Sequence, residues 1–166
     1  MEVVMKVAFV MGSDSDLKVV EKGIQTVKDF GVEVIVRVIS AHRTPQVAEE
    51  FAKTAEENGI GVIVAAAGKA AHLGGVLAAY TTLPVIGLPI KSSTLDGLDS
   101  LLSIVQMPSG IPVATVAIDG AENAGILAVQ MLALGNAELK QKLKDYKLTM
   151  AENVAAKDAA VAEKFK

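Results

Sequence analysis

Five short apolar runs, separated by segments of helical periodicity, limit the folds that this chain can adopt. The runs occupy residues 7–11, 32–39, 61–66, 84–88 and 112–118. Runs this short and this apolar are typical of central parallel strands that are covered on both faces. The helical patterns between and after them occupy residues 16–30, 44–58, 73–80, 98–105 and 123–134. Strand and helix alternate five times, which predicts an α/β fold, a three-layer doubly wound parallel sheet.

We expect the flavodoxin-like strand order 2-1-3-4-5, although periodicity by itself does not fix an order. Residues 137–166 differ from the rest because they are rich in Ala, Lys and Glu and contain neither Gly nor Pro. This composition indicates a long charged helix or a frayed tail outside the sheet. The 166 residues show no linker and no repeat, so we expect one α/β domain over 1–166 with 137–166 as a helical extension.

The composition excludes several classes of function. A net charge of −3 gives no electrostatic footprint for nucleic acid or an anionic membrane. The absence of Cys excludes disulfides, a thiol nucleophile and thiolate metal sites. With only two His, the chain also lacks the ligands of a structural zinc site, so we expect no metal.

Apolar residues make up 51% of the chain, and 25 Ala and 22 Val dominate them. No apolar run approaches the roughly 20 residues that span a bilayer. The N-terminal segment 1–16 has neither a basic region nor a small-x-small cleavage site. We therefore predict a soluble, cytoplasmic protein in which something other than the chain itself covers part of the apolar surface.

The first polar segment that follows a predicted strand is Gly12-Ser13-Asp14-Ser15-Asp16. Gly12 permits a tight turn, and the hydroxyls of Ser13 and Ser15 stand beside free helix N-terminal amides, which favours a phosphate. Two carboxylates would repel a purely anionic ligand, so a phosphate that also carries sugar hydroxyls fits better, with Asp16 on the hydroxyls. Simple capping of the helix by Ser or Asp explains the spacing equally well. The motifs for NAD and ATP are absent.

The second segment, SAHRTP at residues 40–45, contains one of the two histidines next to an arginine. Arg43 offers bidentate recognition of a phosphate, and His42 can give or take a proton near neutral pH. Ligands of such sheets bind at the carboxyl ends of the strands, where this segment is expected. The alternative is a surface His and a solvated Arg ahead of a capped helix.

The third segment, AAAGKAAHLGG at residues 65–75, follows the third strand. Its small side chains allow a ligand to approach the backbone closely. His72 is the second histidine, and a core or interface role is as good an interpretation as catalysis. After the fourth strand, residues 91–97 (KSSTLDG) could close over the site.

Four motifs, in this order, resemble those of the N5-carboxyaminoimidazole ribonucleotide mutase family, the catalytic subunit of bacterial phosphoribosylaminoimidazole carboxylase. They are GSDSD at 12–16, SAHRTP at 40–45, AAHL at 70–73 and GLDSLLSIVQMP at 97–108. The resemblance extends over about residues 5–135. Four motifs in this order are specific evidence for the resemblance, whereas any one of them alone would be weak evidence.

The resemblance implies an isomerase of de novo purine synthesis that converts N5-carboxyaminoimidazole ribonucleotide into 4-carboxy-5-aminoimidazole ribonucleotide without a metal or an organic cofactor. His42 resembles the general acid/base of the family, and His72 would help to place the carboxylate or the CO2 that the enzyme holds. The positions that the resemblance assigns to binding this small ribonucleotide are Gly12, Ser13, Ser15, Asp16, Ser40, Arg43, Gly68, Ala70, Ala71 and Leu73.

Two positions depart from the family pattern. Lys69 stands where the family usually has Gly, and Gly74 stands where it usually has Pro. The lysine could bind a carboxylate or point to solvent, and the glycine loosens the turn. Neither position is His42 or Arg43, so the departures bear on the rigidity of the loop and not on the activity.

Two other functions remain as alternatives. A related branch of the family carboxylates aminoimidazole ribonucleotide directly with CO2, although the intact AAHL segment resembles the mutase branch. A non-catalytic nucleotide-binding module of flavodoxin type is the second alternative. The resemblance also implies a homo-octamer, in which neighbouring subunits would cover segment 65–79 and helix 123–134, and a functional link to the synthetase that forms the carbamate.

Overall fold

The structure is a computed structural model that describes residues 5–166. Residues 1–4, which belong to the N-terminal segment inspected for a targeting signal, lie outside the described residues. The elements in chain order are β1 (Lys6–Met11), the 3-10 turn η1 (Asp14–Asp16), α1 (Leu17–Asp29), β2 (Val34–Val38), α2 (Pro45–Thr54), β3 (Ile60–Gly68), α3 (Leu73–Tyr80), β4 (Val85–Ile90), α4 (Leu98–Val105), β5 (Ala114–Thr115), α5 (Ala121–Leu132) and α6 (Ala137–Glu163).

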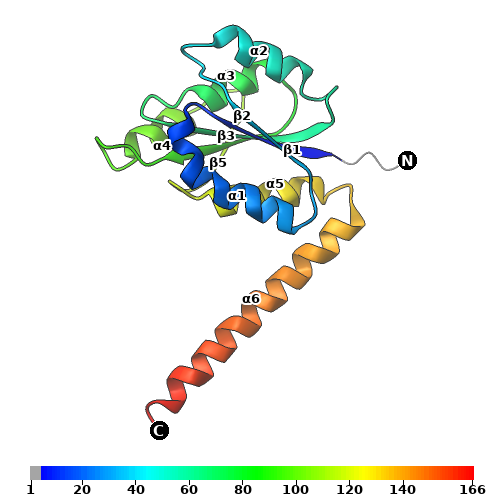
Figure 1. The fold of residues 1–166 in the computed structure, drawn as a ribbon, viewed down its shortest axis with the longest axis vertical. Helices are drawn as coiled ribbons and strands as arrows, with labels where there is room; N and C mark the ends of the chain where they lie inside the picture. Colours follow the sequence, from blue (N-terminus) through cyan, green and yellow to red (C-terminus); the bar gives the residue numbers. More distant parts are fainter. Residues whose placement is uncertain (1–4) are drawn as a thin grey trace.

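The five strands form one parallel sheet in the order β2-β1-β3-β4-β5, which confirms the predicted fold and strand order. β1 pairs with a strand on each side, so that Phe9 lies opposite both Val36 of β2 and Val64 of β3. The crossover helices cover the two faces of the sheet (Figure 1). The chain therefore folds into the three layers that the alternation of strands and helices predicts.

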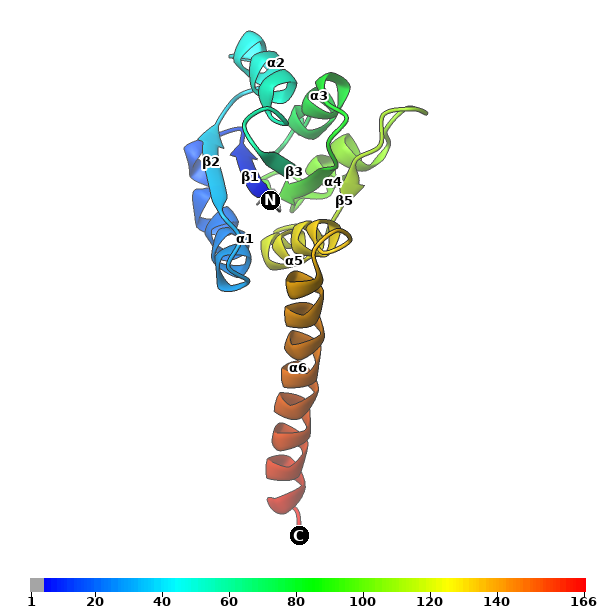
Figure 2. The same cartoon turned by 90° about the vertical axis from the view of Figure 1, so that its right-hand side faces the viewer.

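Two apolar clusters flank the sheet, one on each face. Helices α1 and α5 close the first cluster, in which Phe9 and Val64 are fully buried. Helices α2, α3 and α4 close the second, in which Ile63 and Leu77 are fully buried. The view along the sheet shows these two helical layers on opposite sides of the strands (Figure 2). Alternate residues of one strand thus enter different clusters, as the pleat requires.

The two outer strands differ from the prediction of fully covered central strands. β2 lies at an edge of the sheet, and Val36 and Val38 are 42% and 55% exposed. The apolar run 112–118 forms only the two-residue strand β5, with one further backbone hydrogen bond from Val116 to Gly87. The expected strand order already places both strands at the edges, so the prediction was wrong only in the coverage of β2 and in the length of β5, neither of which an apolar run reveals.

Close packing of α1 against α5 accounts for many of the small residues. A Cβ atom on Gly23 would lie 2.5 Å from the carbonyl oxygen of Ala121, and one on Gly125 would lie 2.8 Å from that of Gly23. Ala124 and Ala128 of α5 are fully buried within the chain. Ala65, Ala66 and Ala67 of the sheet are buried as well, at 7% exposure or less.

The expectation that neighbouring subunits cover segment 65–79 and helix 123–134 stays a prediction, and it concerns only the parts of these segments that the chain itself leaves exposed. Much of both segments is already covered by helices of the same chain, because small side chains let the layers approach closely. One largely exposed apolar side chain, Leu134, lies at the end of the second segment. Several others lie on α4 and α6: Leu98, Leu102, Val105, Leu148, Val154 and Val161.

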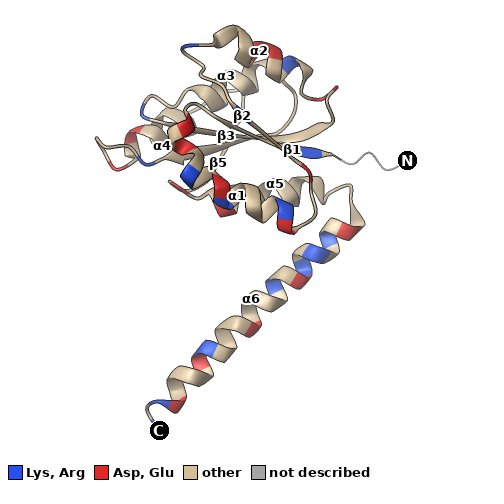
Figure 3. Ribbon diagram, in the orientation of Figure 1, with Lys and Arg blue, Asp and Glu red and all other residues tan. Residues whose placement is uncertain are grey.

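Helix α6 is the long charged helix that the composition of residues 137–166 indicates. Asn136 caps it by accepting a 2.9 Å hydrogen bond from the backbone N–H of Leu139. Leu139 is buried, and Leu143 and Tyr146 pack against the first cluster. Beyond these residues the helix extends away from the sheet as a straight rod with charges of both signs along it (Figures 1 and 3). No helix within residues 5–166 is both long and apolar enough to cross a membrane.

Candidate functional site

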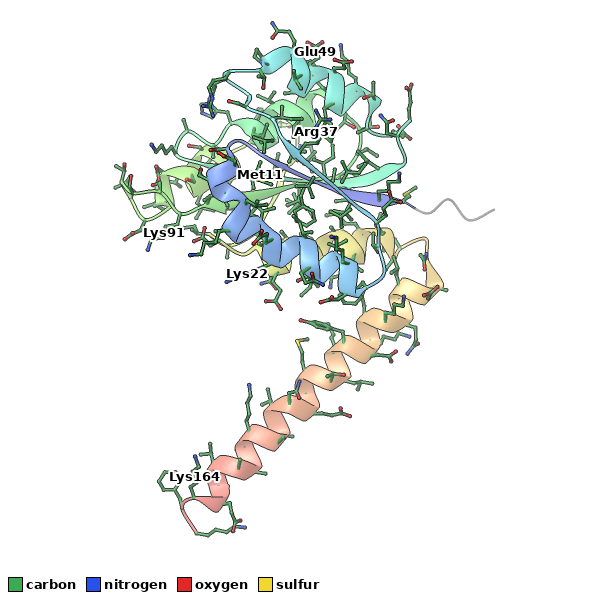
Figure 4. The ribbon with its side chains drawn as sticks, viewed as in Figure 1. Met11, Lys22, Arg37, Glu49, Lys91 and Lys164 are labelled. Atoms are coloured by element: carbon green, nitrogen blue, oxygen red, sulfur yellow. The ribbon has the colours of Figure 1, made fainter. Side chains whose placement is uncertain are left out.

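A cleft of about 610 Å³ lies at the carboxyl ends of β1–β4, where ligands bind in sheets of this kind. Its walls come from the four segments that follow these strands. Met11, the last residue of β1, and Lys91, the first residue after β4, lie toward this edge of the sheet (Figure 4). The size fits a small-molecule site, for which about 300–1,000 Å³ is usual.

The segment after β1 forms a hydroxyl-rich turn that runs directly into α1. Ser13 caps this turn: its Oγ accepts hydrogen bonds from the Ser15 N–H at 3.3 Å and from the Ser15 hydroxyl at 2.9 Å. Asp16 is buried and makes no side-chain cap of α1, which begins one residue later than expected. The turn therefore presents two hydroxyls and free amides at one wall of the cleft.

The carboxyl group of Asp16 is electrostatically unusual. Burial raises its pKa, and the nearby carboxylates of Asp14 and Asp119 add to this effect against opposing hydrogen bonds from Ser15 and Ser13. Burial thus disfavours the charged form of a group that faces the same cleft as Ser13 and Ser15.

The segment after β2 is a tight loop that Thr44 holds together. The Thr44 hydroxyl donates to the carbonyl of Ser40 at 3.0 Å and accepts from its N–H at 3.1 Å, so it pins the loop and does not cap α2. Arg43 donates from Nε to the Ser40 hydroxyl and from Nη2 to the carbonyl of Gly12, both at 3.3 Å. The guanidinium therefore joins the loops after β1 and β2 and keeps further N–H donors for a ligand.

The two histidines meet across the cleft. His42 Nε2 and His72 Nδ1 are 2.9 Å apart, and the rings are nearly perpendicular at 83°. His42 lies in the loop after β2, whereas His72 is the N-cap residue of α3, thirty residues later. Both side chains are exposed toward the cleft. The interpretation of His72 as a core histidine is thereby wrong.

The loop between β3 and α3 has an unusual backbone at Lys69. Its φ is +56°, which lies in the left-handed region that glycine adopts without steric strain and that is unfavourable for residues with a Cβ atom. Lys69 lines the cleft and is exposed, and it forms no ion pair with any residue in the range 5–166. The backbone at Lys69 therefore takes a conformation that favours glycine, and its side chain adds a cation to the site.

The loop after β4 forms the remaining wall. The Ser100 hydroxyl donates to the carbonyl of Ile90 at 2.8 Å, and the Ser92 hydroxyl donates to the carboxylate of Asp99 at 2.7 Å. Lys91 pairs with Asp96 at 3.2 Å. These bonds fix residues 91–97 to α4 and hold them beside the cleft.

The structure brings nearly all of the predicted site residues into this cleft. Those that line it are Gly12, Ser13, Ser15, Asp16, Ser40, His42, Arg43, Gly68, Ala70, His72 and Leu73. Ala71 does not line it, because its side chain is buried in the second apolar cluster. Cleft residues that we did not assign to substrate binding from the sequence are Ala41, Ala67, Lys69, Ile90, Lys91, Ser92 and Ser93.

The sequence contained enough information to assign some of these additional residues to the cleft. Residues 91–93 follow a predicted strand directly, which places them at the carboxyl edge of the sheet. Ile90 and Ala67 are apolar residues inside strands, so nothing in their type distinguishes a cleft position from a core position. Within residues 5–166 no group of three or more His, Cys, Asp and Glu is placed to hold a metal ion.

Comparison with known proteins gives consistent matches over most of the chain. Residues 6–153 match the protein family described as AIR carboxylase. A protein of Pyrococcus abyssi named N5-carboxyaminoimidazole ribonucleotide mutase is 61% identical over 145 residues, which are 87% of this chain and 83% of the relative. A protein of the same name from Methanocaldococcus jannaschii is 52% identical over 160 residues, 96% of this chain and 99% of the relative.

Solved structures agree with these sequence relatives. The crystal structure of Treponema denticola PurE superposes with a TM-score of 0.85 at 29% identity, and the match covers 92% of this chain and 96% of that one.

Proposed function

The chain belongs to the AIR carboxylase family, and we propose that it converts N5-carboxyaminoimidazole ribonucleotide into 4-carboxy-5-aminoimidazole ribonucleotide with His42 as the general acid/base. The protein is then an isomerase of de novo purine biosynthesis. The observation that carries the proposal is the convergence of three motif segments, 12–16, 40–43 and 70–73, on one cleft in a chain 61% identical to a mutase.

The polar groups of the cleft suit the two ends of the substrate. The hydroxyls of Ser13 and Ser15, the amides of their turn and the Arg43 guanidinium suit the phosphate. Asp16 suits the ribose hydroxyls, because a carboxyl group accepts hydrogen bonds from hydroxyls and Asp16 lines the cleft beside Ser13 and Ser15. Ser40, Gly68, Ala70 and Leu73 then line the remaining wall, with Ala71 behind them and outside the cleft.

The proposed chemistry places the base at the histidine pair. The C–N bond of the carbamate breaks, its electron pair stays on nitrogen, and His42 donates a proton to that nitrogen. The released CO2 stays in the cleft, His72 helps to place it, and ring carbon C4 attacks it. His42 then takes the proton that leaves C4, so the same group serves as acid and as base and no net proton is consumed. The scheme uses no metal and no organic cofactor.

Retention of CO2 requires a more enclosed site than the single chain provides, since His42, Arg43 and His72 are all exposed. We infer that copies of the chain assemble into the octamer implied by the family resemblance. The half-exposed apolar side chains of Leu98, Leu102 and Val105 on α4 support this inference. A monomeric mass in solution, measured by light scattering, would overturn it.

The cellular setting follows from the reaction. An enzyme of purine synthesis is expected in the cytoplasm, and it takes its labile carbamate from the synthetase that forms it. Neither a nucleic acid nor a membrane is required as a partner. A mixture of purified synthetase and this protein should therefore deliver carboxylated product faster than spontaneous loss of the carbamate allows.

A spectrophotometric assay of the purified protein tests the activity. We expect turnover with N5-carboxyaminoimidazole ribonucleotide that does not depend on added bicarbonate. Turnover of aminoimidazole ribonucleotide that requires bicarbonate would instead show a direct carboxylase. Binding of either nucleotide without turnover would indicate a binding module and contradict the proposal.

A further inference from the structure

We propose that His72 is a positioning residue that holds the ring of His42 through a hydrogen bond to Nε2, so that the two rings work as one acid/base unit and Nδ1 of His42 faces the substrate. This inference deepens the proposed function and rests on it for its catalytic consequence. The observation behind it is the 2.9 Å contact between His42 Nε2 and His72 Nδ1.

The contact restricts where the protons of the pair can lie. A hydrogen bond between two ring nitrogens needs a proton on one and a lone pair on the other. Two imidazolium rings would each present an N–H at this contact, so they cannot both be charged while it persists. The pair therefore carries at most one positive charge. In that charged form, three protons are distributed over the four ring nitrogens.

The remaining nitrogens are free to act on a ligand. Among residues 5–166, neither His42 Nδ1 nor His72 Nε2 has a hydrogen-bond partner. In the charged pair, His42 holds a proton on Nδ1 and the central proton lies between the rings. When Nδ1 gives its proton to the carbamate nitrogen, the central proton stays on His42 Nε2, and His72 Nδ1 accepts the hydrogen bond from it.

The return step reverses these changes. Proton transfer from ring carbon C4 to His42 Nδ1 restores the charged pair, and the central proton is again shared with His72 Nδ1. Each step moves one proton between His42 and the substrate, so the balance closes without another reactant. His72 acts on the reaction through His42, as the third group of a catalytic triad orients its base.

Two substitutions of His72 distinguish its role in orienting the His42 ring from its role in sharing a proton with that ring. His72→Asn keeps a side-chain amide whose oxygen can still accept the hydrogen bond from His42 Nε2, but which cannot take up a proton. His72→Ala removes the hydrogen bond altogether. We expect His72→Ala to lower kcat by about 10- to 100-fold with KM within about threefold, less than the 10²–10⁴-fold typical of a direct proton donor. His72→Asn should recover part of that loss and narrow the pH range of turnover.

Nuclear magnetic resonance of the substrate-free protein reads the contact without reference to activity. Two-bond ¹H–¹⁵N spectra of the wild type should show unequal protonation of the two His42 nitrogens and a ¹⁵N–¹⁵N coupling between His42 and His72. In His72→Ala the coupling should vanish and the His42 nitrogens should move toward the pattern of a free imidazole.

The outcomes distinguish this inference from the proposed function. If the His42 nitrogens are identical in the wild type and in His72→Ala, or if kcat is unchanged, the pairing is wrong whatever the reaction. If the coupling is present but the wild type fails to convert the substrate, the pairing stands as structure and the proposed function falls. Thermal unfolding of both variants checks that the loss of kcat is not a loss of fold.

Discussion

The cleft and helix α6 are built in opposite ways. Four chain segments, 12–16, 40–43, 67–73 and 90–93, contribute to the cleft, and packing of the whole sheet brings them together. Helix α6 consists of 27 consecutive residues whose backbone hydrogen bonds lie within the same segment. From Thr149 to Lys166 its side chains are all exposed. Figure 4 shows Lys164 at the far end of the rod, away from the sheet.

The cleft therefore depends on long-range packing, whereas α6 depends on local sequence. Changes within the cleft should alter binding and turnover, and comparable changes on α6 should leave both intact.

We expect the largest change, a loss of turnover, from His42→Asn. Asparagine cannot give and take a proton near neutral pH, so turnover should fall by the 10²–10⁴-fold or so that general acid–base catalysis contributes. Substrate should still bind, as isothermal titration calorimetry would show. The matched control on α6 is Val154→Asn, which should keep wild-type turnover. Near-wild-type turnover of His42→Asn would remove the acid/base role.

Arg43→Ala should weaken substrate binding by about 1.5–3 kcal/mol, the range for hydrogen bonds to a charged group, or about 10- to 150-fold in Kd. Arg43→Lys keeps the positive charge but loses the planar set of N–H donors, so its Kd should lie between those of the wild type and Arg43→Ala. Lys157→Ala on α6 removes a charge of the same sign away from the cleft. Equal affinities of the wild type and Arg43→Ala would exclude Arg43 from the phosphate site.

Lys69→Gly tests the left-handed backbone at the rim of the cleft. We expect this variant to be about 1 kcal/mol more stable than Lys69→Ala, because a left-handed φ costs about 1–2 kcal/mol in any residue with a Cβ. Both variants lose the same charge, so urea denaturation isolates the backbone term. If the two variants unfold at the same urea concentration, the left-handed conformation carries no strain.

Asp16→Asn should raise Tm slightly near pH 7. The pKa of Asp16 is raised in the folded state, so its contribution to stability is fully present below the ordinary carboxyl pKa and is lost as pH rises through the raised value. Asparagine removes this penalty at neutral pH, and the difference from the wild type should vanish below about pH 3.9. Calorimetry at several pH values measures it. A difference that grows toward acid would contradict the sign.

The smallest effect should follow removal of residues 151–166. None of these side chains is buried, and surface changes of this kind usually alter the free energy of unfolding by less than about 0.5 kcal/mol. Turnover should stay within about twofold of the wild type. If the shortened chain also loses the mass of an oligomer in solution, α6 joins copies together and the contrast between the two regions is incomplete.

Local sequence predicted most elements, and the misses have physical causes. Helices α3 and α4 begin and end where the periodicity predicts, and α1, α2 and α5 differ by one to four residues at their ends. The apolar run 112–118 yields only the two-residue strand β5, because only Ala114 and Thr115 pair with β4, whereas the other edge strand, β2, pairs with β1 along all five of its residues. Helix propensity and capping act locally, whereas strand length depends on which partner is present.

The site residues show the same division. Position after a predicted strand was enough to single out segments 12–16, 40–45 and 65–75, and the family resemblance then assigned the individual binding residues within them. It could not tell that Ala71 turns into the apolar cluster while Ala70 faces the cleft, because two adjacent alanines look alike in sequence. It also did not anticipate that Arg43 reaches the carbonyl of Gly12, which lies 31 residues earlier.

Alternating short apolar strands and helices, the charged C-terminal helix and the motif segments that resemble one family can all be recognised in the amino-acid sequence. Each of these depends on neighbours within a few positions. The folded chain was needed to show how long the outer strands are, which small residues the chain itself covers, and that His42 and His72 meet at 2.9 Å. Such contacts join residues far apart in the chain, so they exist only after the sheet and its two helical layers have packed together.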